Sequence, residues 1–334
     1  MAKKKKSAKI AIITASTLLM LMVCVSFTVE IFGNKNISKT TSYTTNSFLP
    51  DDEIKDNRVT MLAVGDLMLD RYVKKIIDKK GAKYPFEKIE KLLSGNDLTL
   101  ANLEGSFTDF KPKALNPNNT TFTFDPALIP TLKELGFNIF NLANNHSLNF
   151  GETGFTQSKK YLGENSIDYF GEPMNKEKIS IIKNIRGTKI GFIGYNGFDG
   201  ANFDNVLNEI KKLKPENDFV VVFTHWGIEY QTNFSKTQQK LGHEIIDAGA
   251  DIIIGTHPHV VQPAEKYKDK MIFYSLGNFL FDQTFSKKTQ EGLAVGIIFD
   301  KPDIKYYLFP TEIKKFQVEV KPESKVVSLH DFYF

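Results

Sequence analysis

The chain has 334 residues, of which 41% are hydrophobic and 25% are charged, a composition that is ordinary for a globular protein with a large core. Its formal net charge is +4, but lysines within the first nine residues supply +5 before any acidic residue appears. The other 38 basic residues nearly balance the 39 acidic residues, so the charge pattern excludes the basic surface that nucleic-acid binding requires.

The N-terminal segment is predicted to cross a membrane. Lysines precede twenty uncharged residues, Ile10–Val29, which can span a hydrocarbon core of about 30 Å. Because the positive charge lies on the N-terminal side, we expect residues 1–9 in the cytoplasm and the rest of the chain outside. A cleaved signal peptide is less favoured because residues 25–33 lack an A-x-A pattern. A lipoprotein anchor at Cys24 would need a small residue where Val23 stands.

Residues 30–57 are rich in Ser, Thr, Asn and Asp, which predicts a flexible stalk before a domain at residues 58–334. Cys24, the only cysteine, lies in the apolar segment, so we expect no disulfide bonds in the exported part. The stability of that part must then come from core packing or from bound metal.

From residue 58 onward, short apolar runs alternate with helical stretches, which predicts an α/β fold with helices on the faces of a sheet. The runs suited to buried strands are Val59–Val64, Leu98–Leu103, Asn138–Leu142, Ile167–Phe170, Lys189–Gly194, Phe219–Thr224, Asp251–Gly255 and Lys270–Leu276. Asp125-Pro126 begins one helix, which Gly136 ends. Ser235 and Gln238 form a predicted capping box for another helix, closed by Gly249. A second, antiparallel sheet or a sheet extension is predicted from three last runs, Leu293–Asp300, Ile304–Pro310 and Lys315–Lys321.

Polar groups that could bind a metal follow several of these apolar runs. They are Asp66, Glu104, Asn145, His225, His257 and His259. Ligands of open α/β folds bind beyond the C-terminal ends of the strands. Carboxylate, amide and imidazole groups delivered there are what a site for a divalent metal needs. The sequence therefore predicts a metal site at one edge of the sheet.

Two of these motifs carry most of the signal. His257-Pro258-His259 places two of the six histidines within three positions, and a turn at Pro258 could bring both imidazoles to one centre. The alternative is a polar turn that contains histidines by chance. Asn144-Asn145-His146 offers an amide ligand, and His146 could act as a general acid toward a leaving group. Asparagines also favour turns for purely structural reasons.

In this order, the motifs resemble those of the calcineurin-like metallophosphoesterases. They are more similar still to the bacterial capsule-synthesis branch, the CapA or PgsA proteins linked to poly-γ-glutamate. The six motifs that carry the resemblance are Val64–Leu69, Ala101–Gly105, Leu142–His146, His225–Tyr230, Gly255–Val260 and Ser275–Phe279. The resemblance covers about Val59 to Phe299. It implies a four-layer α-β-β-α sandwich of two stacked sheets with a dimetal site at the sheet edge.

The resemblance also implies two ligand sets. One is Asp66, Glu104 and His259, and the other is Glu104, Asn145, His225 and His257. The phosphoesterase pattern has a further histidine where this chain has Met68, and a thioether is a poor ligand for a hard dication. One tightly held ion with a second bound weakly is therefore as compatible with the sequence as a stable pair. Nitrogen and oxygen ligands admit Zn, Mn or Fe.

Several side chains near the motifs could shape a substrate pocket. They are Arg71, Asn102, Asn144, Trp226, Glu229, Tyr230 and Asn278. A packing role is an equally good interpretation, particularly for the aromatic residues.

The resemblance implies a membrane-anchored protein that works with the membrane components of a poly-γ-glutamate synthetase in polymer synthesis or export. An exported metallophosphoesterase acting on a lipid-linked or nucleotide phosphate is one alternative. A non-catalytic, polymer-binding scaffold is another. The ligand would accordingly be an anionic polymer or a phosphate-containing molecule, and the sequence leaves open whether the chain is an enzyme.

Overall fold

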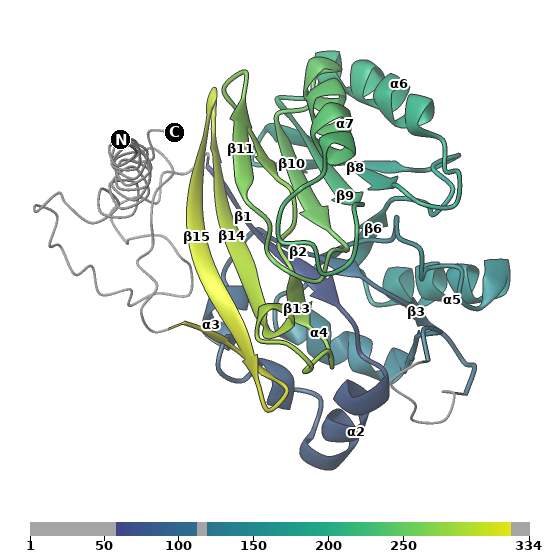
Figure 1. Ribbon diagram of the computed structural model, residues 1–334. Helices are drawn as coiled ribbons and strands as arrows, with labels where there is room; N and C mark the ends of the chain where they lie inside the picture. The colour runs from purple at the N-terminus through teal and green to yellow at the C-terminus, as the bar shows by residue number, and fades with distance from the viewer. Residues whose placement is uncertain (1–57, 112–118, 322–334) are drawn as a thin grey trace, which may run out of the picture. The chain divides into compact units, whose positions relative to one another are not determined.

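The computed structural model describes residues 58–111 and 119–321, which form two mixed β-sheets with helices on their outer faces (Figure 1). The predicted membrane segment at residues 10–29, the basic segment before it and the predicted stalk at residues 30–57 lie outside the described residues. No helix within the described ranges is both long enough and apolar enough to cross a membrane.

The larger sheet has eight strands and contains the start of the domain. Its strands, in spatial order, are β16 (Gln317–Val320), β15 (Asp303–Lys314), β14 (Glu291–Asp300), β1 (Val59–Leu67), β2 (Leu98–Leu103), β5 (Ile139–Asn141) and β6 (Asp168–Phe170), with β13 (Asn278–Leu280) paired to the end of β1. Strands β1, β2, β5 and β6 are parallel. The antiparallel strands β14, β15 and β16 extend the sheet, which confirms the sheet extension predicted for the tail.

The smaller sheet has six strands. In spatial order they are β11 (Ala264–Tyr267), β12 (Lys270–Phe273), β10 (Ile252–Thr256), β9 (Phe219–His225), β8 (Thr188–Asn196) and β7 (Ser180–Ile185). The four inner strands are parallel, and the edge strands β11 and β7 are antiparallel to their neighbours. A separate two-stranded pair joins β3 (Ser106–Phe107) to β4 (Thr123–Phe124).

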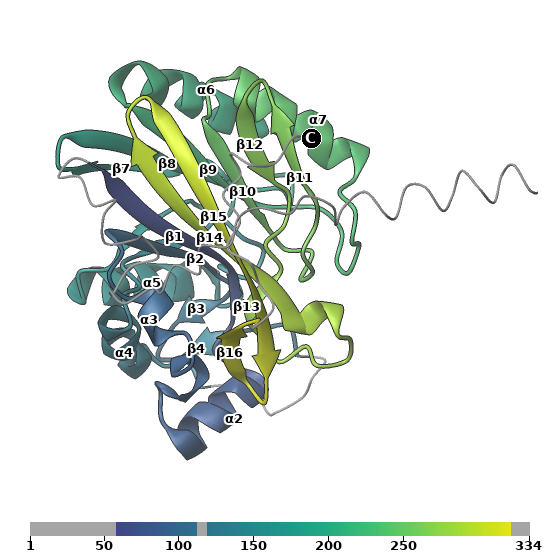
Figure 2. The same ribbon diagram turned by 90° about the vertical axis from the view of Figure 1, so that its left-hand side faces the viewer.

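Helices cover the outer face of each sheet (Figures 1 and 2). The larger sheet carries α2 (Arg71–Lys80), α3 (Glu90–Leu93), α4 (Ile129–Glu134) and α5 (Gly151–Glu164). The smaller sheet carries α6 (Phe203–Leu213) and α7 (Lys236–Asp247). Single 3-10 turns lie at Tyr84–Phe86, Pro126–Leu128, Lys214–Glu216 and Lys288–Gln290.

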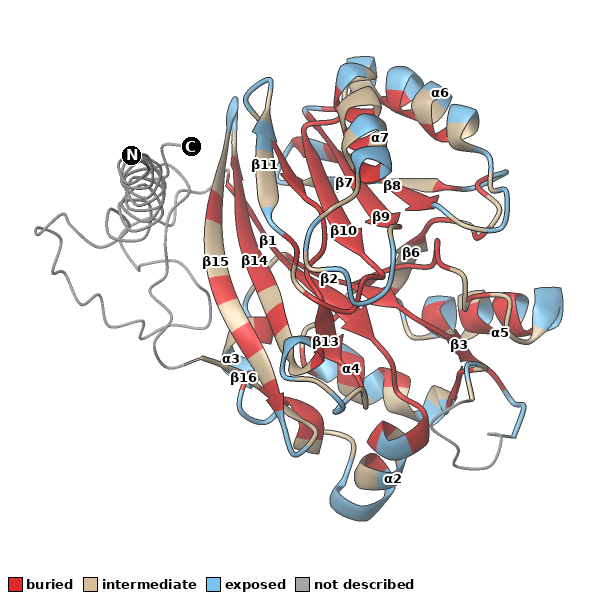
Figure 3. Cartoon of the chain, in the orientation of Figure 1, coloured by how far each residue is buried: buried red, intermediate tan, exposed pale blue. Residues whose placement is uncertain are grey.

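The core between the two sheets follows from the alternation of side chains along each strand. In β1, Met61 and Ala63 face the second sheet and share a cluster with Phe223 of β9. The intervening Leu62 and Val64 face the helices of the first outer layer. Both faces of the central strands are therefore buried, as the red strands in Figure 3 show. The resulting order of helix, sheet, sheet and helix is consistent with the four-layer arrangement that the resemblance implied.

Most of the predicted elements are present. Each of the eight apolar runs overlaps a strand, and the capping box at Ser235 and Gln238 begins α7 as predicted. The helix expected from Asp125-Pro126 is a 3-10 turn that continues into α4. Sequence reasoning missed the edge strand β7, because its side chains alternate between partly buried and exposed rather than forming an apolar run.

Two glycines let the backbone approach closely where the strands end. A Cβ on Gly65 would lie 1.9 Å from the carbonyl oxygen of Gly277, and a Cβ on Gly255 would lie 2.1 Å from that of Tyr274. Only glycine fits such contacts. The N–H of Asp66 consequently donates to the Gly277 carbonyl at 3.1 Å, which fixes the residue at the sheet edge.

At the opposite end of β1, Asp97 forms hydrogen bonds that connect its own segment to those of Thr60 and Arg186. Its carboxylate accepts hydrogen bonds from the N–H of Thr60 at 2.8 Å and from Nη1 of Arg186 at 2.6 Å. Burial alone would raise the pKa of Asp97, but the Arg186 guanidinium and the Thr60 N–H together hold the pKa below its usual value.

We predict that Asp97→Asn lowers the free energy of unfolding near neutral pH by about 1–3 kcal/mol. Because the folded-state pKa is lowered, the carboxylate stabilises the fold above its unfolded-state pKa, and that contribution is lost as the pH falls through the folded-state pKa. Urea unfolding of both proteins at neutral pH and below about pH 4 should show a difference that shrinks in acid. A difference that persists in acid would contradict this, and Asp269→Asn, whose side chain is 90% exposed, is the control.

Candidate metal centre

The polar residues predicted to bind metal converge at one edge of the two sheets. Asp66 lies near the end of β1, Glu104 directly follows β2, and Asn145 follows β5. The second sheet contributes His225 at the end of β9 and the His257-Pro258-His259 turn after β10. Because the parallel strands of both sheets end at this edge, their C-terminal residues face a shared space.

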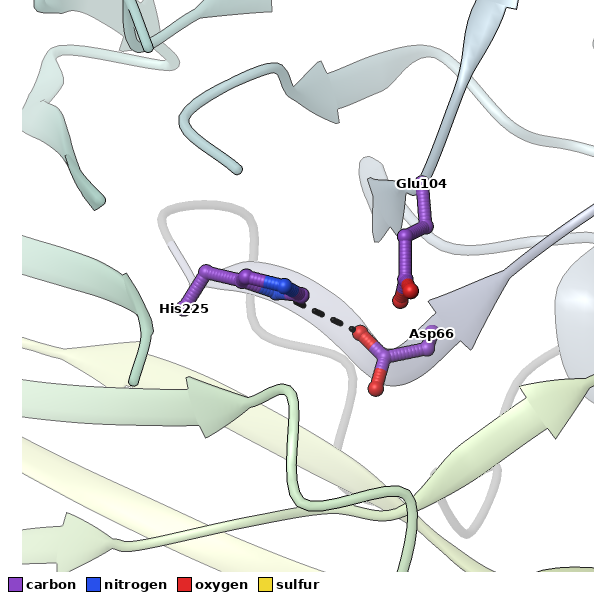
Figure 4. A group of neighbouring side chains, drawn as sticks. All are labelled: Asp66, Glu104 and His225. Carbon is purple, nitrogen blue, oxygen red and sulfur yellow. Dashed lines mark ion pairs between the residues drawn. The ribbon is translucent and has the colours of Figure 1, made fainter. Parts of the chain in front are cut away.

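Three fully buried side chains form the centre of this group (Figure 4). Asp66, Glu104 and His225 each offer a ligand atom, and these atoms all lie within 4.8 Å of one another. Nδ1 of His225 is 3.8 Å from Oδ1 of Asp66. Figure 4 shows the three side chains, which come from both sheets, pointing toward one another.

Glu104 is the least satisfied of these groups. Among the described residues, neither of its buried carboxylate oxygens has a hydrogen-bond partner. The closest imidazole nitrogens are Nε2 of His259 at 3.6 Å and Nε2 of His146 at 3.7 Å. Burial raises the pKa of Glu104 well above its usual value, against the charge of His259 and reinforced by that of Asp66. A buried carboxylate without donors is unfavourable, and a bound cation would remove that penalty.

A second set of atoms meets at His225. Its Nε2 is 3.0 Å from Oδ1 of Asn145 and 3.2 Å from Nδ1 of His257. These separations are near the roughly 3.3 Å expected between ligands held about 2.0–2.1 Å from one tetrahedral ion. The donor set of two imidazoles and one amide oxygen therefore fits a divalent metal.

The tautomer of His225 decides whether Nε2 can bind. The hydroxyl of Thr256 donates to the carbonyl of Thr224 at 2.9 Å, so its oxygen can accept from His225 Nδ1 at 3.0 Å and leave a lone pair on Nε2. Asn102 Nδ2 lies 3.1 Å from the same Nδ1 and favours the opposite tautomer. A metal ion would select the first arrangement, because the nitrogen opposite the ligand nitrogen must carry the proton.

The three histidines differ in charge. Burial lowers the pKa of His225 well below its usual value. Burial and the charge of His259 lower the pKa of His257 to about 3. Burial alone would lower the pKa of His259 too, but the carboxylates of Glu104 and Asp66 raise it to about 9. Burial alone would raise the pKa of Asp66, but a hydrogen bond with His259 and the charges of His225 and His259 together lower it.

The turn at Pro258 orients both flanking histidines toward Asp66. His257 and His259 have φ values of 95° and 57°, backbone conformations that residues other than glycine rarely adopt. The N–H of His257 donates to Oδ2 of Asp66 at 3.1 Å, and Nδ1 of His259 lies 3.5 Å from the same oxygen. Two of the residues predicted to bind metal therefore have unfavourable backbone conformations, which the contacts with Asp66 help to maintain.

A chain of buried asparagines fixes the orientation of Asp66. Asn102 Nδ2 donates to Oδ1 of Asp66 at 2.8 Å, while Asn102 Oδ1 accepts from Asn141 Nδ2 at 3.0 Å and Asn144 Nδ2 at 3.1 Å. Asn102 and Asn144, which were expected to bind substrate, are fully buried in this network. Sequence reasoning missed Asn141, and the only signal was a polar residue near the end of an apolar run.

Met68 does not take part in the centre. Its sulfur accepts a hydrogen bond from the N–H of Asp70 at 3.0 Å, and its side chain packs in the core under the first helical layer. The set of Asp66, Glu104 and His259 therefore receives no ligand atom from position 68, as expected from the methionine there.

A cavity of about 540 Å³ opens beside these residues. Glu104, His146 and His259 line it, as do Arg71, Glu229 and Tyr230 from the predicted substrate-binding set. The other predicted substrate-binding residues, Asn102, Asn144, Trp226 and Asn278, do not line the cavity. Trp226 donates from Nε1 to the Tyr274 carbonyl at 2.9 Å within the core under α7, where it has a packing role. Asn278 holds Nδ1 of His259 through its Oδ1 at 2.9 Å.

His146 faces the cavity in a neutral form. Nδ1 of His146 lies 3.2 Å from Oδ1 of Asn149, which can accept a hydrogen bond from a protonated Nδ1. In this tautomer the lone pair is on Nε2. Burial lowers the pKa of His146 to about 4. Near neutral pH it is therefore uncharged and a weak base, and it must gain a proton before it can act as the general acid that the sequence suggested.

These observations define an α/β protein with a buried group of carboxylates and imidazoles that could hold a divalent metal ion. The family described as bacterial capsule synthesis protein PGA_cap matches residues 60–283, and the chain belongs to this family.

Two relatives show the extent of the likeness. The capsule biosynthesis protein CapA of Bacillus anthracis is 33% identical over 272 residues, covering 75% of this chain and 66% of that protein. The PGA biosynthesis protein CapA of Bacillus subtilis (strain 168) is 32% identical over 257 residues, covering 72% of this chain and 67% of that protein. The chain thus matches about two thirds of the length of these relatives. A hypothetical protein from Thermus thermophilus is similar in structure, with a TM-score of 0.49 and 17% identity over 75% of this chain and 99% of that one.

We predict that Asn141→Ala weakens metal binding by about 10- to 100-fold, the usual effect of removing an outer partner of a ligand. Asn138→Ala is the matched control, because its amide also bonds across the same strands, to Asp97 and Thr99, at the far end of β5. Both variants should lose similar stability, about 1–3 kcal/mol. Competition with a chromogenic chelator measures the affinity, and equal metal affinities in the two variants would refute the role assigned to Asn141.

We predict that Glu104→Gln leaves the metal-free protein at least as stable, because it replaces a buried carboxyl group whose oxygens have no hydrogen-bond partner among the described residues. The same change should weaken metal binding by more than the roughly 100-fold seen for outer partners. Thermal unfolding with and without Zn²⁺ or Mn²⁺ measures both effects. Glu229→Gln, an acid on the same cavity but not among the predicted ligands, should keep the metal-induced rise in unfolding temperature. An undiminished rise in Glu104→Gln would rule out Glu104 as a ligand.

Proposed function

We propose that this protein takes part in poly-γ-glutamate capsule production as a membrane-anchored accessory of the polymer synthetase. Membership of the capsule synthesis family across residues 60–283 carries the proposal. The name of the Bacillus subtilis relative, a PGA biosynthesis protein, supports poly-γ-glutamate as the polymer involved. The sequence pattern supports the topology, with residues 1–9 in the cytoplasm, residues 10–29 in the membrane and the domain from residue 58 outside.

We further propose that the buried centre holds one or two divalent ions. Asn145, His225 and His257, with Glu104, form the set that best fits one ion. Asp66, Glu104 and His259 form a poorer second set, since Met68 is turned into the core. When bound, such an ion supplies Lewis acidity and activates water near neutral pH.

The residues of the chain supply the rest of a hydrolytic site. The neutral His146 can take up a proton at Nε2 and return it to a leaving oxygen or nitrogen. Asn278 keeps the His259 ring oriented, and the asparagine network does the same for Asp66. The layers of packed side chains around the centre exclude water from the buried face of the ligands.

An exported phosphoesterase that acts on a lipid-linked or nucleotide phosphate is the second candidate function. The observation that favours it is the cavity, which brings an external ligand directly to Glu104, His146 and His259. A long polymer does not require a cavity of about 540 Å³, whereas a small phosphate ester suits one.

A gene deletion with complementation tests the proposed function. We expect deletion to reduce the amount, the chain length or the surface retention of poly-γ-glutamate, and the wild-type gene to restore it. The His257→Ala plus His259→Ala variant should fail to restore it. His243→Ala is the matched control, because His243 lies on α7 and bonds to Glu265 away from the centre.

Two results would change the conclusion. If deletion leaves the amount, length and retention of the polymer unchanged, the capsule role is wrong. If the double histidine variant restores the polymer fully, the protein acts as a scaffold that does not need the metal. His146→Ala then separates chemistry from binding, since a hydrolytic role requires its proton transfer.

A further inference from the structure

Exposed aromatic side chains gather at the mouth of the cavity. Among the described residues, six large hydrophobic side chains are exposed, and three of them line this cavity. Tyr72, Tyr230 and Phe285 are 38%, 42% and 67% exposed. They come from α2, from the loop after β9 and from the loop after β13, so chain proximity does not explain their meeting. Exposed apolar groups concentrated in one place mark a binding surface.

Part of the cavity wall has an unfavourable backbone conformation, and Tyr230 is the one of the three exposed rings that shares it. Four lining residues other than glycine have positive φ values, namely Arg71 at 53°, Tyr230 at 64°, His259 at 57° and Phe316 at 63°. Phe316 lies in the turn between β15 and β16, at the same end of the larger sheet as α2 and β13 (Figure 2). Unfavourable backbone conformations persist where the surrounding structure imposes them, and they cluster at functional sites.

Hydrogen bonds and ring contacts fix the mouth. The N–H of Tyr230 donates to the Pro258 carbonyl at 2.8 Å, and its hydroxyl accepts from Nε2 of Gln283 at 3.3 Å. The Tyr230 ring meets Phe285 edge to face, with 5.1 Å between centroids, and lies 6.1 Å from the His259 ring. The aromatic surface therefore continues directly into the predicted metal centre.

The charges at the mouth do not suit an anion. Glu229 and Asp282 line it, and among the described residues the only guanidinium or lysine ammonium group lining the cavity is that of Arg71. That guanidinium is taken up by Asp282, with Nε 3.1 Å from Oδ2 and a second bond from Nη2. It is also stacked between Phe122 and Phe281, at 4.9 and 5.5 Å from the ring centroids. An anionic group would therefore find positive charge at the floor of the cavity, where the predicted metal centre lies.

We propose that the mouth is a subsite for an uncharged ring of a small organic anion whose charged end reaches the floor. The proposal rests on the proposed metal site and names the ligand class for it, a ring-bearing phosphate or carboxylate rather than the polyglutamate chain. A flat ring can stack against Phe285 and Tyr230, whereas successive carboxylates of the polymer would meet the carboxylate of Glu229.

Two phosphonates with the same charged head isolate the contribution of the ring. The full-length protein, purified in detergent and loaded with Mn²⁺, is titrated by calorimetry with methylphosphonate and with phenylphosphonate. We expect phenylphosphonate to bind about tenfold more tightly or better. Phe285→Ala should weaken the binding of phenylphosphonate and leave that of methylphosphonate unchanged, so that the two affinities become similar.

Phe110→Ala is the matched control, because Phe110 is 42% exposed but stacks on Phe150 outside the cavity. This variant should keep the wild-type preference. Adenosine 5′-monophosphate and glucose 1-phosphate, tested as competitors, then show whether the mouth prefers a base or a sugar ring.

Equal affinity for the two phosphonates, a preference unchanged in Phe285→Ala, or no phosphonate binding would each overturn the proposal. Tighter binding of tetra-γ-glutamate that displaces phenylphosphonate would also overturn it, while leaving the capsule role intact. Conversely, an intact ring preference in a protein whose deletion does not affect the polymer would reject the capsule role alone.

Discussion

The buried carboxylate of Glu104 is the constraint around which the rest of the site is arranged. Its oxygens have no hydrogen-bond partner among the described residues, and two imidazole nitrogens lie within 3.7 Å of one of them. An isolated carboxylate at this depth is strongly unfavourable. The cost is relieved when the carboxyl group takes up a proton, as its raised pKa indicates, or when the protonated His259 or a divalent ion supplies positive charge nearby. The close-packed layers on both sides keep water from the buried face of the site, and the cavity leaves the other face accessible.

Rigid surroundings keep the predicted ligands in position. Gly65 near the end of β1 and Gly255 near the end of β10 let the backbones pack closely. Hydrogen bonds with Asn102 and Asn278 orient the side chains of Asp66 and His259. In contrast, the mouth of the cavity is built largely from loops, and its rings are exposed. The molecule thus combines a buried, polar floor with an exposed aromatic entrance, the pairing of polar and apolar groups that is usual in ligand-binding cavities.

The strand ends were predictable from the sequence because buried parallel strands form apolar runs and the functional residues follow them directly. The direction of a side chain was harder to predict. Trp226 and Asn278 both lie within the sequence motifs. Trp226 nevertheless packs in the core, and Asn278 forms a hydrogen bond with Nδ1 of His259. Asn141 was missed because its role depends on two neighbouring strands meeting at one point. The aromatic mouth was also beyond sequence reasoning, since its residues come from distant segments.

The predicted metal ligands are divided between the two sheets. Asp66, Glu104 and Asn145 belong to the first sheet, and His225, His257 and His259 belong to the second. An ion held between them would be a cross-link between the two halves of the sandwich, comparable in effect to a staple. Such a site cannot exist until both halves have folded and docked, so metal capture would be a late event in the maturation of the protein. By the same geometry, release of the ion would free the ligands of one sheet from those of the other, so loss of metal would loosen this edge of the sandwich.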